Sequence, residues 1–286
     1  MRRDEIRVLV RRSREVVLLA ALTGIVVGFA VRGFEYLVDE TFYRLLEGPV
    51  WVSAAAPAVG LVCAAIALRV VGGGTSSATS DEYLRAFHDP QYRLGLRHLA
   101  GRVAAAIATL GSGGALGMEG PAMYGGATIG RAIQDRLPRP FRGSDHRTLL
   151  LAGAAAGVAA IFKAPATGAI FALEVPYRDD MARRMLLPAL VASATGYLTF
   201  VTLTDTTPLL SVGLFDSPSF EMVDLLGALL VGAACAIGAR AFAKLIRIAK
   251  ALAWRALPLR LAVSGLGLAG LVYASRALTD QSLSLG

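Results

Sequence analysis

The 286-residue sequence contains little charge for its length. Only 17% of its residues are Asp, Glu, Lys or Arg, whereas soluble domains carry about 25%. Hydrophobic residues make up 55% of the chain, and its mean hydropathy is +0.57. Length alone would allow a soluble two-domain protein. The shortage of charge indicates instead a protein that lies in a membrane.

Cysteine and histidine are also scarce. Cys63 and Cys235 both lie within apolar runs, so we expect no disulfide framework and interpret them as small core residues. His88, His98 and His146 are scattered, and no two of them have the spacing of a helical metal site. We therefore expect no bound metal and no cofactor.

The chain contains long apolar runs with little or no charge. Most of these runs approach the roughly 20 residues that a helix needs to cross a bilayer. Two further apolar regions, 103–129 and 148–173, contain glycine and proline and are interpreted as interrupted membrane helices. The sequence thus predicts an all-α, polytopic membrane protein. The runs expected to cross the bilayer are 16–34, 49–68, 186–204, 225–238 with its flanks, and 261–274.

The basic residues set the expected orientation, because cytoplasmic segments carry an excess of Lys and Arg. Residues 1–15 form a basic N-terminal segment with six arginines, and residues 240–260 hold six Lys or Arg. Residues 202–224 hold none. We expect the N-terminus in the cytoplasm and 202–224 outside. The net charge of +8 then reflects inner loops that rest on anionic lipid, so no nucleic-acid partner is expected.

The most informative motif is Gly-Ser-Gly-Gly-Ala-Leu-Gly-Met-Glu-Gly-Pro at residues 111–121. Its acid, Glu119, is the only one between Asp89 and Asp135. An ionised carboxylate is costly within a membrane, so such an acid is a functional candidate. The glycines allow backbone N–H groups to approach a small ion, and Pro121 suits the first turn of a helix. The motif predicts a broken helix whose positive N-terminal end faces an anion.

Two other segments carry weaker signals. Residues 72–82 lead from three glycines into a hydroxyl-rich run, in which Thr79 and Glu82 have capping-box spacing for a helix that begins near Ser80. This run is either a flexible loop before a capped helix or an anion ligand, because a serine hydroxyl at a helix N-terminus can donate to an anion.

Residues 153–174 form the third segment, which by itself is a packing element. Gly153 and Gly157 allow helices to approach closely, and Pro165 must break or kink its helix. Asp145 or Ser144 is expected to cap the start of that helix.

In this order, the three segments resemble the CLC family of chloride channels and proton-coupled chloride transporters. Residues 117–121, G-M-E-G-P, are similar to the family's G-R-E-G-P motif. Residues 153–174, with K-A-P and F-A-L-E, are similar to its A-G-A-A-A-G…N-A-P-L-A-G…F…E-E segment. The resemblance covers most of the chain from about Gly72 and implies broken, re-entrant helices in the first half of an inverted-repeat fold.

The resemblance implies roles for the matched residues. Glu119 matches the gating glutamate, whose carboxylate competes with anions and swings away when it is protonated. The backbone amides around Gly117, Met118 and Gly120 would hold the anion.

Two more positions follow from the resemblance. Ser77 matches the serine of the family's G-S-G-I-P loop, and Ser76 matches nearly as well. Arg102, 17 positions before Glu119, falls where the family carries a basic residue that raises the local anion potential. Alternatively, Arg102 marks the cytoplasmic end of a helix.

The sequence also departs from the family pattern. Met118 replaces an Arg, Lys163 replaces an Asn, and the G-S-G-I-P loop is not literally present. Val175 stands where transporters of the family often have a second acid that passes protons. We therefore expect passive or weakly coupled flux of a halide, with chloride as the substrate and a fluoride-type protein as the alternative.

The resemblance also indicates which parts of the family's anion site this sequence contains. The family's second half supplies a G-x-F-x-P loop and a tyrosine to the anion site, and neither is found here. We expect residues 16–286 to form a CLC-type transmembrane domain that is incomplete at its C-terminus, in a prokaryotic plasma membrane, and a homodimer if completed. The alternatives are a transport-inactive structural or regulatory subunit, and a hydrolase that uses Ser112, whose surroundings lack the nucleophile-elbow pattern.

Overall fold

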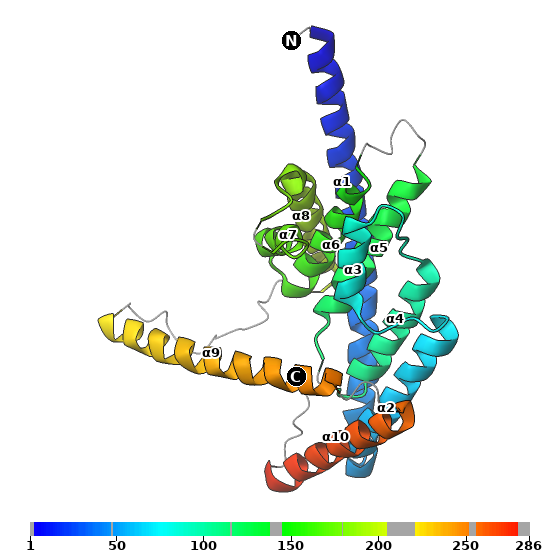
Figure 1. Cartoon of the computed structure of the whole chain (residues 1–286), viewed down its shortest axis with the longest axis vertical. Helices are drawn as coiled ribbons and strands as arrows, with labels where there is room; N and C mark the ends of the chain where they lie inside the picture. Colours follow the sequence, from blue (N-terminus) through cyan, green and yellow to red (C-terminus); the bar gives the residue numbers. More distant parts are fainter. Residues whose placement is uncertain are drawn as a thin grey trace. The chain divides into compact units, whose positions relative to one another are not determined.

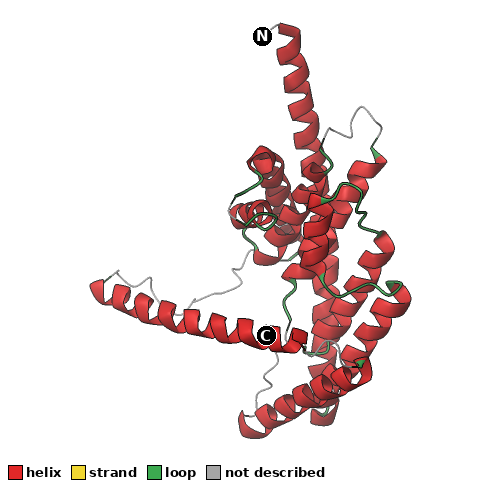
Figure 2. Ribbon diagram, viewed as in Figure 1, coloured by secondary structure: helices red, strands yellow, loops and turns green. Residues whose placement is uncertain are grey.

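The computed structural model describes residues 3–46, 48–114, 116–137, 145–178, 180–204, 221–251 and 256–279. Figure 2 shows that all regular elements within these ranges are helices. The predicted outer loop lies mostly outside them. The chain divides into two compact units, residues 1–209 with 265–286 and residues 210–264. The all-α fold predicted from the sequence is confirmed.

Ten α-helices are described (Figure 1), together with a π-helical turn at Ala67–Val71 and a 3₁₀ turn at Arg183–Met185. The first helix begins in the basic segment and continues without a break past residue 15. The α-helices are α1 (Arg3–Leu46), α2 (Val50–Ile66), α3 (Thr79–His88), α4 (Leu96–Leu110), α5 (Glu119–Arg136), α6 (Arg147–Phe162), α7 (Pro165–Glu174), α8 (Leu186–Leu203), α9 (Met222–Ala251) and α10 (Leu257–Thr279).

Five of the described helical segments are long and apolar enough to cross a bilayer, and each contains one of the predicted runs or most of it. The protein is therefore an integral, multi-pass membrane protein. The segments are Arg14–Leu45, Trp51–Val71, Arg183–Leu203, Met222–Ala251 and Leu257–Ser275.

The two interrupted helices are also confirmed. The region 103–129 contains the end of α4, a loop, and the start of α5 at Glu119. The region 148–173 is broken between Phe162 and Pro165, where Lys163 takes a left-handed conformation with φ 51°. Asn and Gly adopt this conformation with less strain than other residues do, which gives a physical reason for the family's Asn at this position.

Helix α6 forms the centre of the first unit, in contact with α1, α5, α7 and α8 (Figure 1). Every residue from Leu149 to Ile161 is buried. A Cβ added at Gly153 would overlap the backbone of Gly126 in α5, and one added at Gly157 would overlap Ala122. The predicted close packing at these small residues is confirmed, and it brings the α5 and α6 backbones together.

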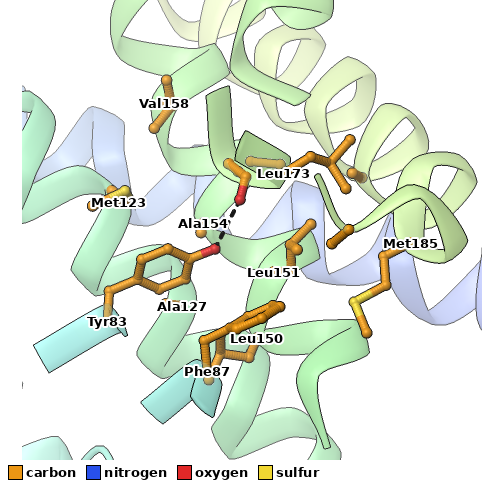
Figure 3. Packing of buried hydrophobic residues seen from close by; sticks show 14 of the residues in the cluster. Tyr83, Phe87, Met123, Ala127, Leu150, Leu151, Ala154, Val158, Leu173 and Met185 are labelled. Atoms are coloured by element: carbon orange, nitrogen blue, oxygen red, sulfur yellow. Dashed lines mark hydrogen bonds between the residues drawn. The ribbon is translucent and has the colours of Figure 1, made fainter. Parts of the chain in front are cut away.

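Helix α3 is attached to this core through its aromatic side chains. Tyr83 and Phe87 are fully buried, and the Tyr83 hydroxyl donates to the Ala172 carbonyl of α7 at 3.0 Å (Figure 3). Helix α3 begins at Thr79, but its N-cap Ala78 offers no side-chain bond. The predicted capping box is wrong, because the Glu82 carboxylate binds other side chains.

Two smaller predictions have opposite outcomes. The backbone N–H of Arg147 donates to the Asp145 carboxylate at 3.0 Å, so Asp145 binds the start of α6 as predicted, while Ser144 lies outside the described residues. Cys63 and Cys235 are free but exposed, so their assignment to the core is wrong. Apolar residues on membrane helices can face lipid, which the apolar pattern of the sequence does not distinguish from a core.

Candidate functional site

The site is built around the break between α4 and α5. Glu119 is the first residue of α5 and follows the N-cap residue Met118, which has φ −79° and ψ −10°. The loop before it turns at Gly113, whose φ of +85° favours glycine. The first N–H groups of a helix have no partner within the helix, so α5 presents the positive end of its dipole at Glu119.

The Glu119 side chain folds back over its own loop. A Cβ added at Gly117 would overlap the Glu119 carboxylate, so the carboxylate lies directly against the Gly117 backbone. Glu119 is only partly buried. Gly117 is therefore required for this position of the acid, and an L side chain there would push the carboxylate away.

A pocket of about 260 Å³ opens beside this loop. Gly117, Met118 and Glu119 line it, while Gly120 does not. Glu35 and Asp39 of α1 also line it, and the sequence reasoning missed both of them. Their spacing of four residues, which places them on one face of a helix, was the available signal.

Basic groups offset part of the negative charge that Glu35, Asp39 and Glu119 bring to the pocket. Arg32 Nη1 lies 2.8 Å from the Glu35 carboxylate, and the positive charge of Lys163 also acts on Glu35. The residues that line the pocket also include Phe162, at the end of α6. Both helix breaks therefore contribute to the same pocket.

The two candidate serines lie on the loop before α3. Ser76 and Ser77 are both exposed, and Ser77 does not line the pocket beside Glu119. The residue of this segment that faces the Glu119 loop is Thr79, because a Cβ added at Gly120 would lie 2.7 Å from the Thr79 hydroxyl. The N-terminal ends of α3 and α5 thus approach one another at Thr79, which the sequence reasoning treated as a capping residue.

Arg102 lies in the middle of α4, not at a helix end, and is 4% exposed. Its guanidinium group donates to the Ser76 carbonyl at 2.9 Å and to the Tyr124 hydroxyl at 2.5 Å, and it lies 4.6 Å above the Tyr124 ring. Arg102 Nη2 lies 3.3 Å from the Glu82 carboxylate, which also accepts a bond from Tyr92. Arg102 of α4 therefore links three parts of the chain through its side chain, namely the serine loop, α3 and α5.

Ser112 is buried in a helix contact. Its hydroxyl donates to the Thr109 carbonyl at 3.0 Å, and a Cβ added at Gly60 of α2 would overlap that hydroxyl. This environment is that of a packing residue, and it gives no support to a nucleophilic serine.

Comparison with known proteins identifies the family. The family model described as voltage gated chloride channel matches residues 60–285. The chain belongs to this family. Curated relatives that match include an H(+)/Cl(−) exchange transporter, a chloride channel protein and a chloride/fluoride channel protein.

Two bacterial relatives show the extent of the similarity. The chain is 33% identical over 172 residues to the H(+)/Cl(−) exchange transporter ClcA of Cronobacter sakazakii, over 56% of this chain and 36% of that protein. It is 30% identical over 178 residues to the chloride/fluoride channel protein of Pseudomonas syringae pv. tomato, over 61% of this chain and 38% of that protein. The matched segments thus span little more than a third of these CLC proteins.

Solved CLC structures show the same fold. A CLC-type fluoride/proton antiporter superposes with a TM-score of 0.75 at 24% identity, over 93% of this chain and 65% of the other. A slow cyanobacterial Cl⁻/H⁺ antiporter superposes with a TM-score of 0.72 at 18% identity, over 94% of this chain and 68% of the other. At these identities the likeness establishes the CLC fold alone.

The family's Arg position is occupied by a packing side chain. Met118 is partly buried and packs against apolar clusters that include Val31 and Phe34 of α1. An uncharged residue here leaves the loop without a positive side chain, so the contribution of Met118 to an anion site would be limited to its backbone.

Proposed function

We propose that this protein conducts a halide, with chloride as its substrate, across a prokaryotic plasma membrane and that Glu119 gates the flux. In this proposal the ionised carboxylate occupies an anion position beside the Gly117 backbone. Protonation removes its charge and releases it, because a neutral carboxyl no longer competes with an anion for the N–H groups of α5.

The position of the Glu119 carboxylate carries the proposal. It lies over Gly117, at the N-terminal end of α5 and in a pocket that both helix breaks line. Thr79 at the N-terminal end of α3 approaches the same loop. Helix N-termini that converge within a membrane favour negative charge, so the arrangement suits an anion that the carboxylate can replace.

Several finer features belong to the same proposal. The N-terminus lies in the cytoplasm, the completed protein is a homodimer, and no cofactor takes part. Val175 at the position of a second acid favours passive or weakly coupled flux over strict proton exchange. The similarity to a chloride/fluoride channel protein keeps fluoride as the alternative halide.

Reconstitution of the 286-residue chain in liposomes tests the function. We expect chloride efflux above that of protein-free liposomes, and a fluoride efflux assay in parallel identifies the preferred halide. A correctly folded chain that releases neither anion would support the alternative of a transport-inactive structural or regulatory subunit.

Gly117→Ala tests the position of the gate. The new methyl group would overlap the Glu119 carboxylate, which can move because it is the far end of a flexible side chain. We expect anion efflux at neutral pH to rise by about three- to tenfold. This rise corresponds to a loss of about 0.7–1.4 kcal/mol from the free energy with which the carboxylate competes against the anion. The measurement is the initial rate of efflux from liposomes at fixed protein density.

Gly125→Ala is the matched control for this prediction. It adds the same methyl group in α5, where the nearest neighbour is Leu99 at an ordinary 3.6 Å, and it should leave efflux unchanged. Equal efflux from the wild type and Gly117→Ala, with both folded, would show that the carboxylate does not occupy the anion position.

A further inference from the structure

At the other end of α5, the Arg131 side chain is buried without full pairing. Arg131 is 7% exposed. Its Nε donates to both oxygens of the Asp135 carboxylate at 3.2 Å, and its Nη2 donates to the Pro90 carbonyl at 3.3 Å. Its Nη1 is buried and has no partner within the described residues. A buried donor of a charged group without a partner is costly, so an occupant of this position is expected.

His146 supplies a second unpartnered atom in the same region. Its Nε2 is also buried and has no partner within the described part of the chain. The other ring nitrogen, Nδ1, lies 3.8 Å from the Asp145 carboxylate. When the ring is protonated, both nitrogens carry a hydrogen, so Nε2 is then a donor.

The packing of α5 against the start of α6 places these two residues in the same region, where the positive charge of Arg131 acts on His146. Gln134, one turn after Arg131, donates to the Asp145 carbonyl at 2.8 Å and accepts from the Leu149 N–H at 3.2 Å. A Cβ added at Gly130 would overlap the Leu149 backbone. The start of α6, with His146 as its N-cap, is therefore fixed against the last turns of α5.

The charge around His146 is mixed and favours the neutral ring. Burial lowers the pKa of His146, and the positive charges of Arg131 and then Arg147 lower it further, while Asp145 and the Phe87 carbonyl oppose the shift. Arg147 is paired with Asp145 at 2.9 Å, and Arg131 is paired with Asp135. A water molecule suits the Nη1 donor while the ring is neutral.

We infer that Arg131 and His146 form a proton-linked binding site for a small monovalent inorganic anion, separate from Glu119 and about 18 Å away along α5. When His146 is protonated, both unpartnered atoms are donors on positively charged groups, which attract an anion. Because the anion binds the protonated form, its affinity rises as the pH falls through the pKa of His146, and bound anion raises that pKa.

Histidine NMR on the full 286-residue chain in detergent micelles tests this inference. The pKa of His146 is measured in sodium chloride and in sodium gluconate at equal ionic strength. We expect chloride to raise it by about 0.5–1 unit, which corresponds to a three- to tenfold preference of the anion for the protonated site. His88 and His98, both exposed, are internal controls and should not respond.

Variants separate the site from its surroundings and from the gate. Arg131→Gln should remove the chloride effect, while Arg136→Gln, an exposed arginine of the same helix, should retain it. Glu119→Gln should also retain it, so this result is independent of the proposed gating. An identical His146 pKa in chloride and gluconate in the unmodified chain would overturn the inference and indicate a buried water only.

Discussion

Glu119→Gln is expected to abolish the pH dependence of anion efflux. Gln has the shape of the protonated acid and never carries its charge, so the competition with the anion at Gly117 is lost at every pH. We expect efflux at neutral pH to rise about tenfold, equivalent to about 1.4 kcal/mol, to the level that the wild type reaches in acid. The measurement is the rate of chloride efflux from liposomes across a series of pH values.

Glu40→Gln is the control for this experiment. Glu40 is an acid of α1 that pairs with Arg44 at 2.6 Å and does not line the pocket, so its variant should keep the wild-type pH profile. If Glu119→Gln shows the same profile as the wild type, Glu119 is not the gate. Such a result would leave the membership of the family and the fold untouched.

Arg102→Met is expected to cause the largest loss of stability. It would remove the bonds to Ser76 and Tyr124 and leave the Glu82 carboxylate, with only 13% of its side chain exposed, without its cation. Breaking a buried ion pair by removing one partner costs about 3–5 kcal/mol. The free energy of unfolding is measured by titrating the protein from mild detergent into SDS, followed by circular dichroism.

A double variant and a matched control define the cause of this loss. Arg102→Met with Glu82→Gln should recover a large part of the stability, because no uncompensated charge then remains buried. Arg97→Met removes exposed bonds from the same helix to Val70 and Val71 and should cost less than about 1 kcal/mol. Equal losses for Arg102→Met and Arg97→Met would contradict the role of Arg102 as a cross-link.

Local sequence signals predicted the two helix breaks correctly. Glycine and proline around Glu119 and Pro165 act on the backbone of their own segment, so the two helix breaks followed directly from residue types. Gly153 and Gly157 likewise indicated close helix packing, although not which helix would be their partner.

The serine loop was harder to predict. Ser77 was chosen by its place in a motif, but the chain turns so that Thr79 approaches Gly120 and Ser77 is exposed. A shift of one or two residues in a loop changes which side chain faces a site, and no periodic pattern of the sequence fixes that shift. The capping box was wrong for a related reason, since Glu82 pairs with Arg102 from another helix.

The sequence by itself determined that this protein crosses a membrane, that its helices break beside Glu119 and Pro165, and that an acid stands at the start of α5. Each of these follows from residue composition or from the backbone preferences of neighbouring residues. Only the tertiary structure placed Glu35 and Asp39 in the pocket of Glu119 and gave Arg102 its partners. It also buried Arg131 Nη1 and His146 Nε2 without a partner in the described part of the chain. Those contacts depend on how each helix is rotated and packed against the others, which residues near in sequence do not fix.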